Sequence, residues 1–214
     1  MNVTIFGAGN MGKALGTRFA AGGHSITFVS RNPENAEKAV SIVRVAAKGG
    51  AMVDSATQDN VKLGDVVVQA VWYGTNIELV KQLGARLTGK VVVDIANPVN
   101  STYNGLITAP DSSSAEDVAK VSTAGVNVVK AFNTTFSSTL LSGKVAGQTL
   151  DVFIAGDDPD AKTIVGQLIK DGGMRPVNTG SLSSARLIEG MALLHILVQG
   201  SLGTNWDSSV KILS

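Results

Sequence analysis

A glycine-rich turn close to the N-terminus constrains the fold of this chain more than any other feature. Residues 7–12, Gly-Ala-Gly-Asn-Met-Gly, have the spacing GxGxxG, directly after the apolar run 3–6 and before a helical pattern over 11–21. In such a strand–turn–helix unit, Gly7 would make the tight turn, Gly9 would admit a pyrophosphate next to the backbone, and Gly12 would let the helix pack on the strand. The motif therefore predicts a dinucleotide-binding unit, with Asn10 and Met11 at the helix N-terminus. The alternative is a glycine turn without a ligand.

The end of the second predicted strand indicates which dinucleotide binds. An Asp or Glu at this place would accept hydrogen bonds from the ribose 2′-hydroxyl of NAD. This chain instead has Ser30, Arg31 and Asn32, and Ser30 lies 18 residues after Gly12, where that acid is expected. Because a hydroxyl and a guanidinium suit a 2′-phosphate, we predict NADP as the cofactor. An ordinary Ser-Arg surface turn is the alternative.

Short β-branched runs alternate with helical patterns along the chain. The sequence predicts strands at 3–6, 26–29, 51–53, 66–71, 91–95 and 126–132, and helices at 11–21, 33–47, 75–86 and 115–120. A strand at 151–155, a helix at 159–170, a strand at 174–177 and a helix at 183–200 follow. This alternation is typical of a Rossmann-type, doubly wound α/β fold with a mostly parallel sheet. We expect residues 1–145 to form the dinucleotide-binding domain and residues 146–214 a small C-terminal α/β cap that extends the sheet.

The composition excludes several classes of function. The chain has no cysteine, which excludes disulfides, thiol catalysis and thiolate metal sites, and its two histidines, His24 and His195, are far apart, so no metal site is predicted. The formal charge of +1 argues against a nucleic-acid-binding protein. No apolar run reaches the ~18 residues of a membrane span, and the N-terminus does not read as a signal peptide. We therefore expect a cytoplasmic protein.

With these features the sequence resembles the coenzyme F420-dependent NADP oxidoreductases and, similarly, the NADPH-binding domain of the STEAP metalloreductases. The resemblance extends over almost the whole chain. Besides the glycine motif and Ser30-Arg31, it rests on the segments Gly-Gly-His at 22–24, Lys-Ala-Phe-Asn-Thr at 130–134, Ala-Gly-Asp-Asp at 155–158 and Gly-Ser-Leu-Ser-Ser-Ala-Arg at 180–186. It implies direct hydride transfer between NADP(H) and a small-molecule redox co-substrate, either F420 or a flavin. Such a reaction needs no general base, metal or nucleophile.

The resemblance also implies where the nicotinamide half of the cofactor lies. Ala70, Val71 and Trp72 follow the fourth predicted strand, and Asn97 and Pro98 follow the fifth. All five residues are expected along the nicotinamide.

The same resemblance implies that the acceptor ring lies beside Asn133 and Thr135, after the sixth strand, with Met191 from the last helix. The deazaflavin-using members of the family often carry His and Ile where this chain has Asn133 and Thr135. The acceptor therefore stays open between F420, FMN, FAD and another compound.

Several other polar residues invite interpretation. His24 is expected to be a turn residue that bonds backbone, and His195 a satisfied core or interface histidine. Lys130 is either a phosphate contact or a solvated lysine. Arg186 and Glu189 have the i, i+3 spacing and are expected to pair with each other or with a neighbour.

The last helical segment and the tail indicate how the site is completed. The run 187–198 is apolar all round, which predicts a buried helix or an interface, and we expect a homodimer through it. The polar tail 200–209, which contains Trp206, is expected to line the acceptor pocket or a dimer contact. Residues 146–214 would then complete both the pocket and the dimer.

Two other functions remain open. A non-catalytic NADPH sensor would share the fold, but a sensor could fill the space above the nicotinamide that an oxidoreductase must leave open. The β-hydroxyacid dehydrogenases and imine reductases share the N-terminal fold but add a large helical domain. Here the segment after the sixth strand is short and contains two strand patterns.

Overall fold

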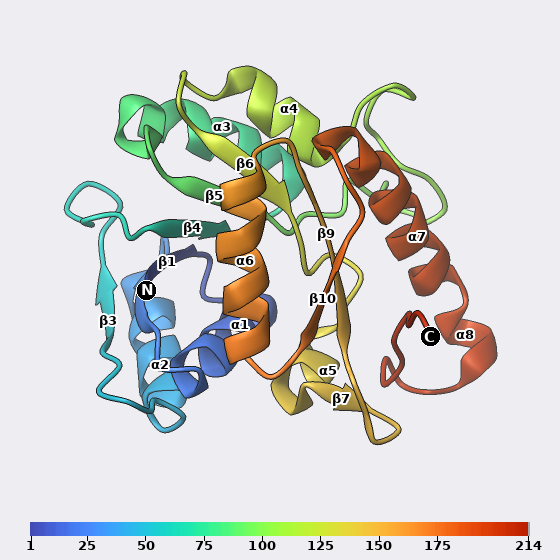
Figure 1. Cartoon of the computed structure of the whole chain (residues 1–214), viewed down its shortest axis with the longest axis horizontal. Coiled ribbons are helices and arrows are strands. Elements are labelled where there is room, and N and C mark those ends of the chain that lie inside the picture. The colour runs from blue at the N-terminus through green and yellow to red at the C-terminus, as the bar shows by residue number, and fades with distance from the viewer. Residues whose placement is uncertain (214) are drawn as a thin grey trace.

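An eight-stranded sheet runs through the centre of the computed structural model, which describes residues 1–213 (Figure 1). Its strands are β1 (Asn2–Phe6), β2 (Ser25–Val29), β3 (Val53–Ala56), β4 (Val66–Gln69), β5 (Val91–Asp94), β6 (Asn127–Lys130), β9 (Asp151–Gly156) and β10 (Arg175–Asn178). They lie in the order β10-β9-β6-β5-β4-β1-β2-β3. Every neighbouring pair is parallel except β6 and β9. The mostly parallel, Rossmann-type sheet is confirmed.

Helices cover both faces of this sheet. They are α1 (Asn10–Ala21), α2 (Pro33–Arg44), α3 (Tyr73–Leu83), α4 (Ser114–Val121), α5 (Ser137–Ser142), α6 (Pro159–Asp171), α7 (Ala185–Leu197) and α8 (Gln199–Leu202). Two 3-10 helices, η1 (Gly84–Leu87) and η2 (Leu182–Ser184), and a hairpin of β7 (Lys144–Val145) and β8 (Gln148–Thr149) complete the described chain.

Each face of the sheet has its own hydrophobic core. In β4, Val66 and Val68 point into the core beneath α1, α2 and α6, whereas Val67 points into the core beneath α3, α4 and α7. A strand buried on both faces has no polar side to show water, which explains its unbroken run of valines.

The order of the strands indicates where a ligand-binding crevice is expected. The chain proceeds from β1 to β2 and β3 on one side and returns to β4, β5 and β6 on the other. In such open sheets the ligand lies at the carboxyl ends of the strands where the direction of winding changes. That point is the gap between the ends of β1 and β4.

Some predicted boundaries were wrong by a few residues. The third strand begins at Val53 rather than at 51, because Val53 is the residue that pairs with Ile26. The predicted helix 33–47 ends at Arg44, and its last residues form tighter turns in which Ala46 N–H donates to the Val43 carbonyl. The predicted helix 183–200 is divided among η2, α7 and α8. Strands β9 and β10 extend the same sheet. Within residues 1–213, no helix is long and apolar enough to cross a membrane.

Candidate functional site

The glycine turn between β1 and α1 is closed against its neighbours on two sides and open on the third. A Cβ at Gly7, which has a φ of +108°, would lie 2.2 Å from the Ala70 carbonyl oxygen, and one at Gly12 would lie 2.0 Å from the Gly7 carbonyl oxygen. By contrast, a Cβ at Gly9 would meet nothing within 4 Å. The turn is therefore packed on the protein side and free on the side where a pyrophosphate would lie.

The N-terminus of α1 faces this open space. Gly9 is its N-cap, and its first turn has neither a side-chain cap nor an acidic residue. The first helical hydrogen bond runs from Lys13 N–H to the Gly9 carbonyl, so the N–H groups that precede it are available to a ligand. A free helix N-terminus of this kind suits a phosphate group.

A cavity of about 710 Å³ opens beside the glycine turn. It brings together three residues of the glycine motif and most of the predicted nicotinamide and acceptor residues. They are Gly9, Asn10 and Met11 from the motif, and Ala70, Val71, Trp72, Asn97, Asn133 and Thr135. None of its lining residues, all within 1–213, has a charged side chain. The surface of this cavity is therefore uncharged.

A second cavity of about 550 Å³ adjoins the first, because Val71 lines both. It is lined by Gly7, Ser30, Arg31 and Asn32, and no acidic residue lines it in the described part of the chain. The Asn32 side chain also caps α2 by accepting from Glu34 N–H at 2.9 Å. Among residues 1–213, nothing forms an ion pair with Arg31, which is exposed and available to an anion.

In the described part of the chain, three of the predicted site residues line neither cavity. Gly12 lies beneath the turn, where it packs helix against strand. Pro98 stands between two lining residues without lining the cavity itself. Met191 packs on the core beneath α3 and α4, and Ile196 is the α7 residue that reaches the cavity.

One wall of this cavity comes from segments that are distant in sequence from the glycine turn. Tyr103, Phe136, Ile196, Asn205 and Trp206 line it. Of these, Asn205 and Trp206 belong to the tail 200–209, which was expected there as one of two alternatives. Tyr103 and Phe136 lie in loops and Ile196 lies in an apolar helix, where no local pattern indicates a binding role. Only the three-dimensional fold identifies them.

A cluster of aromatic rings supports this wall. Phe136 packs edge-on against Trp206 with ring centroids 5.0 Å apart and lies 4.5 Å from the ring of His195. The Thr134 carbonyl accepts from His195 Nδ1 at 3.2 Å, so the neutral ring accepts from Ser208 Oγ at Nε2, 2.8 Å away. Burial lowers the pKa of His195. The interpretation as a satisfied core histidine is confirmed.

Asn97 and Asn133 join the ends of β5 and β6 across the floor of the large cavity. Asn97 Nδ2 donates to the Asn133 carbonyl at 2.7 Å, and Asn133 Nδ2 donates to Asn97 Oδ1 at 2.9 Å. Within residues 1–213, Asn133 Oδ1 is buried without a hydrogen-bond partner. A buried acceptor of this kind calls for a donor that the described protein residues do not supply.

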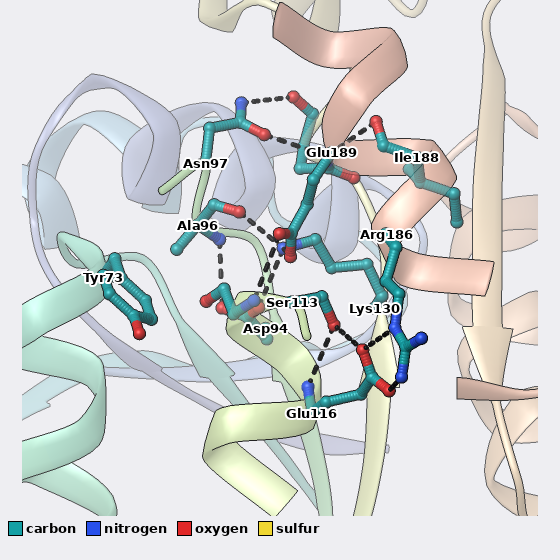
Figure 2. Close-up of polar contacts among 12 residues, drawn as sticks. Tyr73, Asp94, Ala96, Asn97, Ser113, Glu116, Lys130, Arg186, Ile188 and Glu189 are labelled. Carbon is teal, nitrogen blue, oxygen red and sulfur yellow. Dashed lines mark hydrogen bonds and ion pairs between the residues drawn. The ribbon is translucent and has the colours of Figure 1, made fainter. Parts of the chain in front are cut away.

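Neither interpretation of Lys130 was right. Its side chain is fully buried and forms ion pairs with Asp94 at 2.8 Å and Glu189 at 2.6 Å (Figure 2). Burial raises the pKa of Glu189, against the opposing effect of Lys130. Lys130 points to the face of the sheet that α7 covers, because it alternates with Val129 along β6.

Two further side chains find partners away from their own elements. Arg186 pairs with Glu116 of α4 rather than with Glu189, as its predicted alternative allowed. The expectation for His24 is confirmed for its backbone alone, whose N–H donates to the Phe19 carbonyl at 3.0 Å. The imidazole is instead buried between the N-terminal amino group, 3.1 Å from Nδ1, and Asp171, 3.1 Å from Nε2, and it lines neither cavity.

Comparison with known proteins agrees with this geometry. The family described as NADP oxidoreductase coenzyme F420-dependent matches residues 2–98. An F420-dependent NADP reductase of Methanothermobacter thermautotrophicus is 31% identical over 90% of this chain and 86% of that protein. The metalloreductase STEAP3 of Rattus norvegicus is 29% identical over 89% of this chain but only 36% of its own length.

A solved structure extends the comparison to the whole fold. A protein of Arthrobacter sp. FB24, proposed to be an F420-dependent NADP reductase, has a TM-score of 0.85 and 26% identity over 99% of both chains. Because these matches extend over most of the sequence, the chain belongs to the family of coenzyme F420-dependent NADP oxidoreductases.

Proposed function

We propose that this chain transfers a hydride directly between NADP(H) and coenzyme F420. The observation that carries the proposal is the open, uncharged cavity next to an open glycine turn, with the Arg31 cavity adjoining it. The F420-dependent NADP reductases named above favour F420 over FMN or FAD as the acceptor.

The residues present fit NADP. The N–H groups at the start of α1 would hold the pyrophosphate above Gly9. Ser30 and Arg31 would bind the 2′-phosphate, with Asn32 beside them. Ala70, Val71 and Trp72, with Asn97 and the adjoining Pro98, would run along the nicotinamide half.

The acceptor ring would lie between the cavity floor at Asn133 and the aromatic wall at Trp206. Asn133 Oδ1, which lacks a partner in the described chain, would accept a hydrogen bond from a ligand N–H group. Thr135 closes the same edge and directs its own hydroxyl to the Phe132 carbonyl at 2.6 Å. Met191 would not touch the ring but would support the cavity indirectly, by packing α7 on the core.

The chain supplies position and exclusion of water rather than acid–base catalysis. NADPH supplies the hydride, and the acceptor takes this hydride together with one proton from solvent. Two rings stacked face to face need a narrow, dry slot, which the apolar lining around Ile95, Phe136 and Ile196 provides.

Residues 146–214 complete this arrangement as a C-terminal extension of the 1–145 domain. They supply Trp206 and Ile196 to the cavity and, we propose, the contact of a homodimer. The second copy would cover Leu187, Leu194 and Leu197, three exposed leucines of α7.

The open cavity also separates the proposed function from its alternatives. A sensor of NADPH has no need of free space above the nicotinamide. Oxidation of a hydroxyacid or reduction of an imine calls for a group that moves a proton, and within residues 1–213 no carboxylate, lysine or histidine side chain lines this cavity.

An anaerobic assay tests the proposal. The purified protein is mixed with NADPH and, separately, with F420, FMN or FAD, and the NADPH absorbance band is followed. We expect this band to disappear with F420 but not with FMN or FAD. If NADPH is instead oxidised only with FMN or FAD, that flavin replaces F420 as the proposed acceptor. Tight binding of NADPH without oxidation by any of the three would support an NADPH sensor.

A further inference from the structure

Three charged side chains lie buried together beneath the floor of the large cavity. Lys130 of β6, Asp94 of β5 and Glu189 of α7 have no exposed side-chain surface. Placing charges out of water costs several kcal/mol per ion, and such groups often stabilise a fold no better than apolar ones. Their presence here points to a role other than stability.

The cluster forms hydrogen bonds with both backbone polar groups of one cavity residue, Ala96. Ala96 N–H donates to Asp94 Oδ1 at 3.0 Å, and Lys130 Nζ donates to the Ala96 carbonyl at 2.5 Å (Figure 2). Ala96 and the next residue, Asn97, both line the cavity. The two polar groups of Ala96 are therefore held by the two members of a buried ion pair.

One turn of α7 holds the same floor. Glu189 accepts from Lys130 at Oε1 and from Ser114 N–H, at the start of α4, at 3.1 Å on Oε2. The neighbouring Ile188 carbonyl accepts from Asn133 Nδ2 at 3.4 Å. Consecutive residues of α7 thus reach both Lys130 and Asn133.

We propose that Lys130, oriented by Glu189, is a positioning residue that fixes the floor of the cavity under the reacting rings. Its amino group sets the place of the Ala96 peptide, and through Glu189 this place depends on how α7 packs. The inference rests on the proposed function only for the identity of the rings on the floor.

The variants separate this role from a general loss of stability. Lys130→Met alone would leave two carboxylates without a counter-charge, so Glu189→Gln accompanies it. The double variant K130M/E189Q keeps the net charge of the cluster, and Asp94 keeps the donors Asn76 Nδ2 and Ala96 N–H. Arg186→Gln is the matched control, because Arg186 also joins α7 to α4, through Glu116, but does not touch the floor.

Hydrogen exchange of the backbone at residues 95–99 is the first readout and needs no enzymatic activity. In the double variant we expect exchange at least about tenfold faster than in the parent, whereas R186Q exchanges as the parent does. Glu189→Gln alone keeps the Lys130–Asp94 pair and therefore the fold. We expect it to speed this exchange by about twofold to fivefold.

Binding and single-turnover measurements complete the test. NADPH affinity stays within about twofold, because the pyrophosphate and 2′-phosphate contacts are remote, while hydride transfer to F420 slows by about tenfold to a hundredfold. Equal changes in the double variant and in R186Q, or unchanged exchange at 95–99, would overturn the positioning role. If the parent protein itself transfers no hydride, the proposed function fails, while exchange and affinity still decide the role of Lys130.

Discussion

Asn97 and Asn133 hold each other across the cavity floor, each donating one side-chain hydrogen bond to the other residue. The exchange fixes the orientation of both amides and leaves Asn133 Oδ1 facing no protein donor within residues 1–213. Asn133→Ala removes this acceptor, and we expect kcat/KM for the acceptor to fall about tenfold, or about 1.4 kcal/mol.

Asn60→Ala, at an exposed position, is the control for this measurement. Steady-state kinetics at saturating NADPH report the acceptor alone. A fall in NADPH affinity without a change at the acceptor would place Asn133 against the nicotinamide instead.

The two glycines of the N-terminal turn should respond differently to the same change. Gly9→Ala adds a methyl group to open space at an ordinary φ of −75°, so the protein should unfold at the parent temperature while NADPH binds at least tenfold more weakly. Gly12→Ala places a methyl 2.0 Å from the Gly7 carbonyl and should lower the free energy of unfolding by about 3 kcal/mol.

Thermal unfolding and NADPH titration of both variants check this contrast. If Gly9→Ala binds NADPH as tightly as the parent does, the pyrophosphate does not lie above Gly9.

Arg31 should decide between the two nicotinamide cofactors. Loss of a charged hydrogen bond to a phosphate costs about 2 kcal/mol, so Arg31→Gln should weaken NADPH binding about thirtyfold and leave NADH binding unchanged. Lys38→Gln removes an exposed cation from α2 and controls for the general charge. Equal losses for NADPH and NADH in Arg31→Gln would contradict the 2′-phosphate role.

The glycine turn and the strand pattern were predictable from sequence because they depend on neighbouring residues. Gly7, Ser30 and Arg31 lie within one βαβ unit, and each has a local reason to be there. Lys130 was not predictable, since its partner Glu189 is 59 positions away and arrives only when α7 packs on the sheet. The contact between Phe136 and Trp206 was not predictable for the same reason, because the two rings meet only when the C-terminal tail folds back onto the site.

The buried carboxylate of Asp151 ties this tail to β9, and its ionisation should govern stability in acid. Burial alone would raise the pKa of Asp151, but hydrogen bonds from Arg175, Ile212 N–H and Lys211 outweigh it and lower the pKa to about 2. A carboxyl with a depressed pKa stabilises the fold above the unfolded pKa of about 3.9, and this is lost as the pH falls toward 2.

Asp151→Asn should therefore lower the free energy of unfolding by about 2 kcal/mol at neutral pH, and its loss of stability between pH 4 and pH 2 should be shallower than in the parent. Denaturant unfolding across this range measures both effects. Asp54→Asn, at an exposed ion pair, is the control and should change little. Identical acid profiles for Asp151→Asn and the parent would show that the tail contacts are not made in solution.

The exposed leucines of α7 should mark the homodimer contact. Leu187, Leu194 and Leu197 are 77%, 61% and 52% exposed, although the sequence predicts a helix that is covered on every side. A second copy would cover this apolar face. In light scattering we expect the parent to be a dimer and L187E/L194E to be a monomer that still binds NADPH. Ile42→Glu, on α2, is 52% exposed in the parent and should leave the dimer intact. A monomeric parent would remove the dimer, and with it the reason for an apolar outer face on α7.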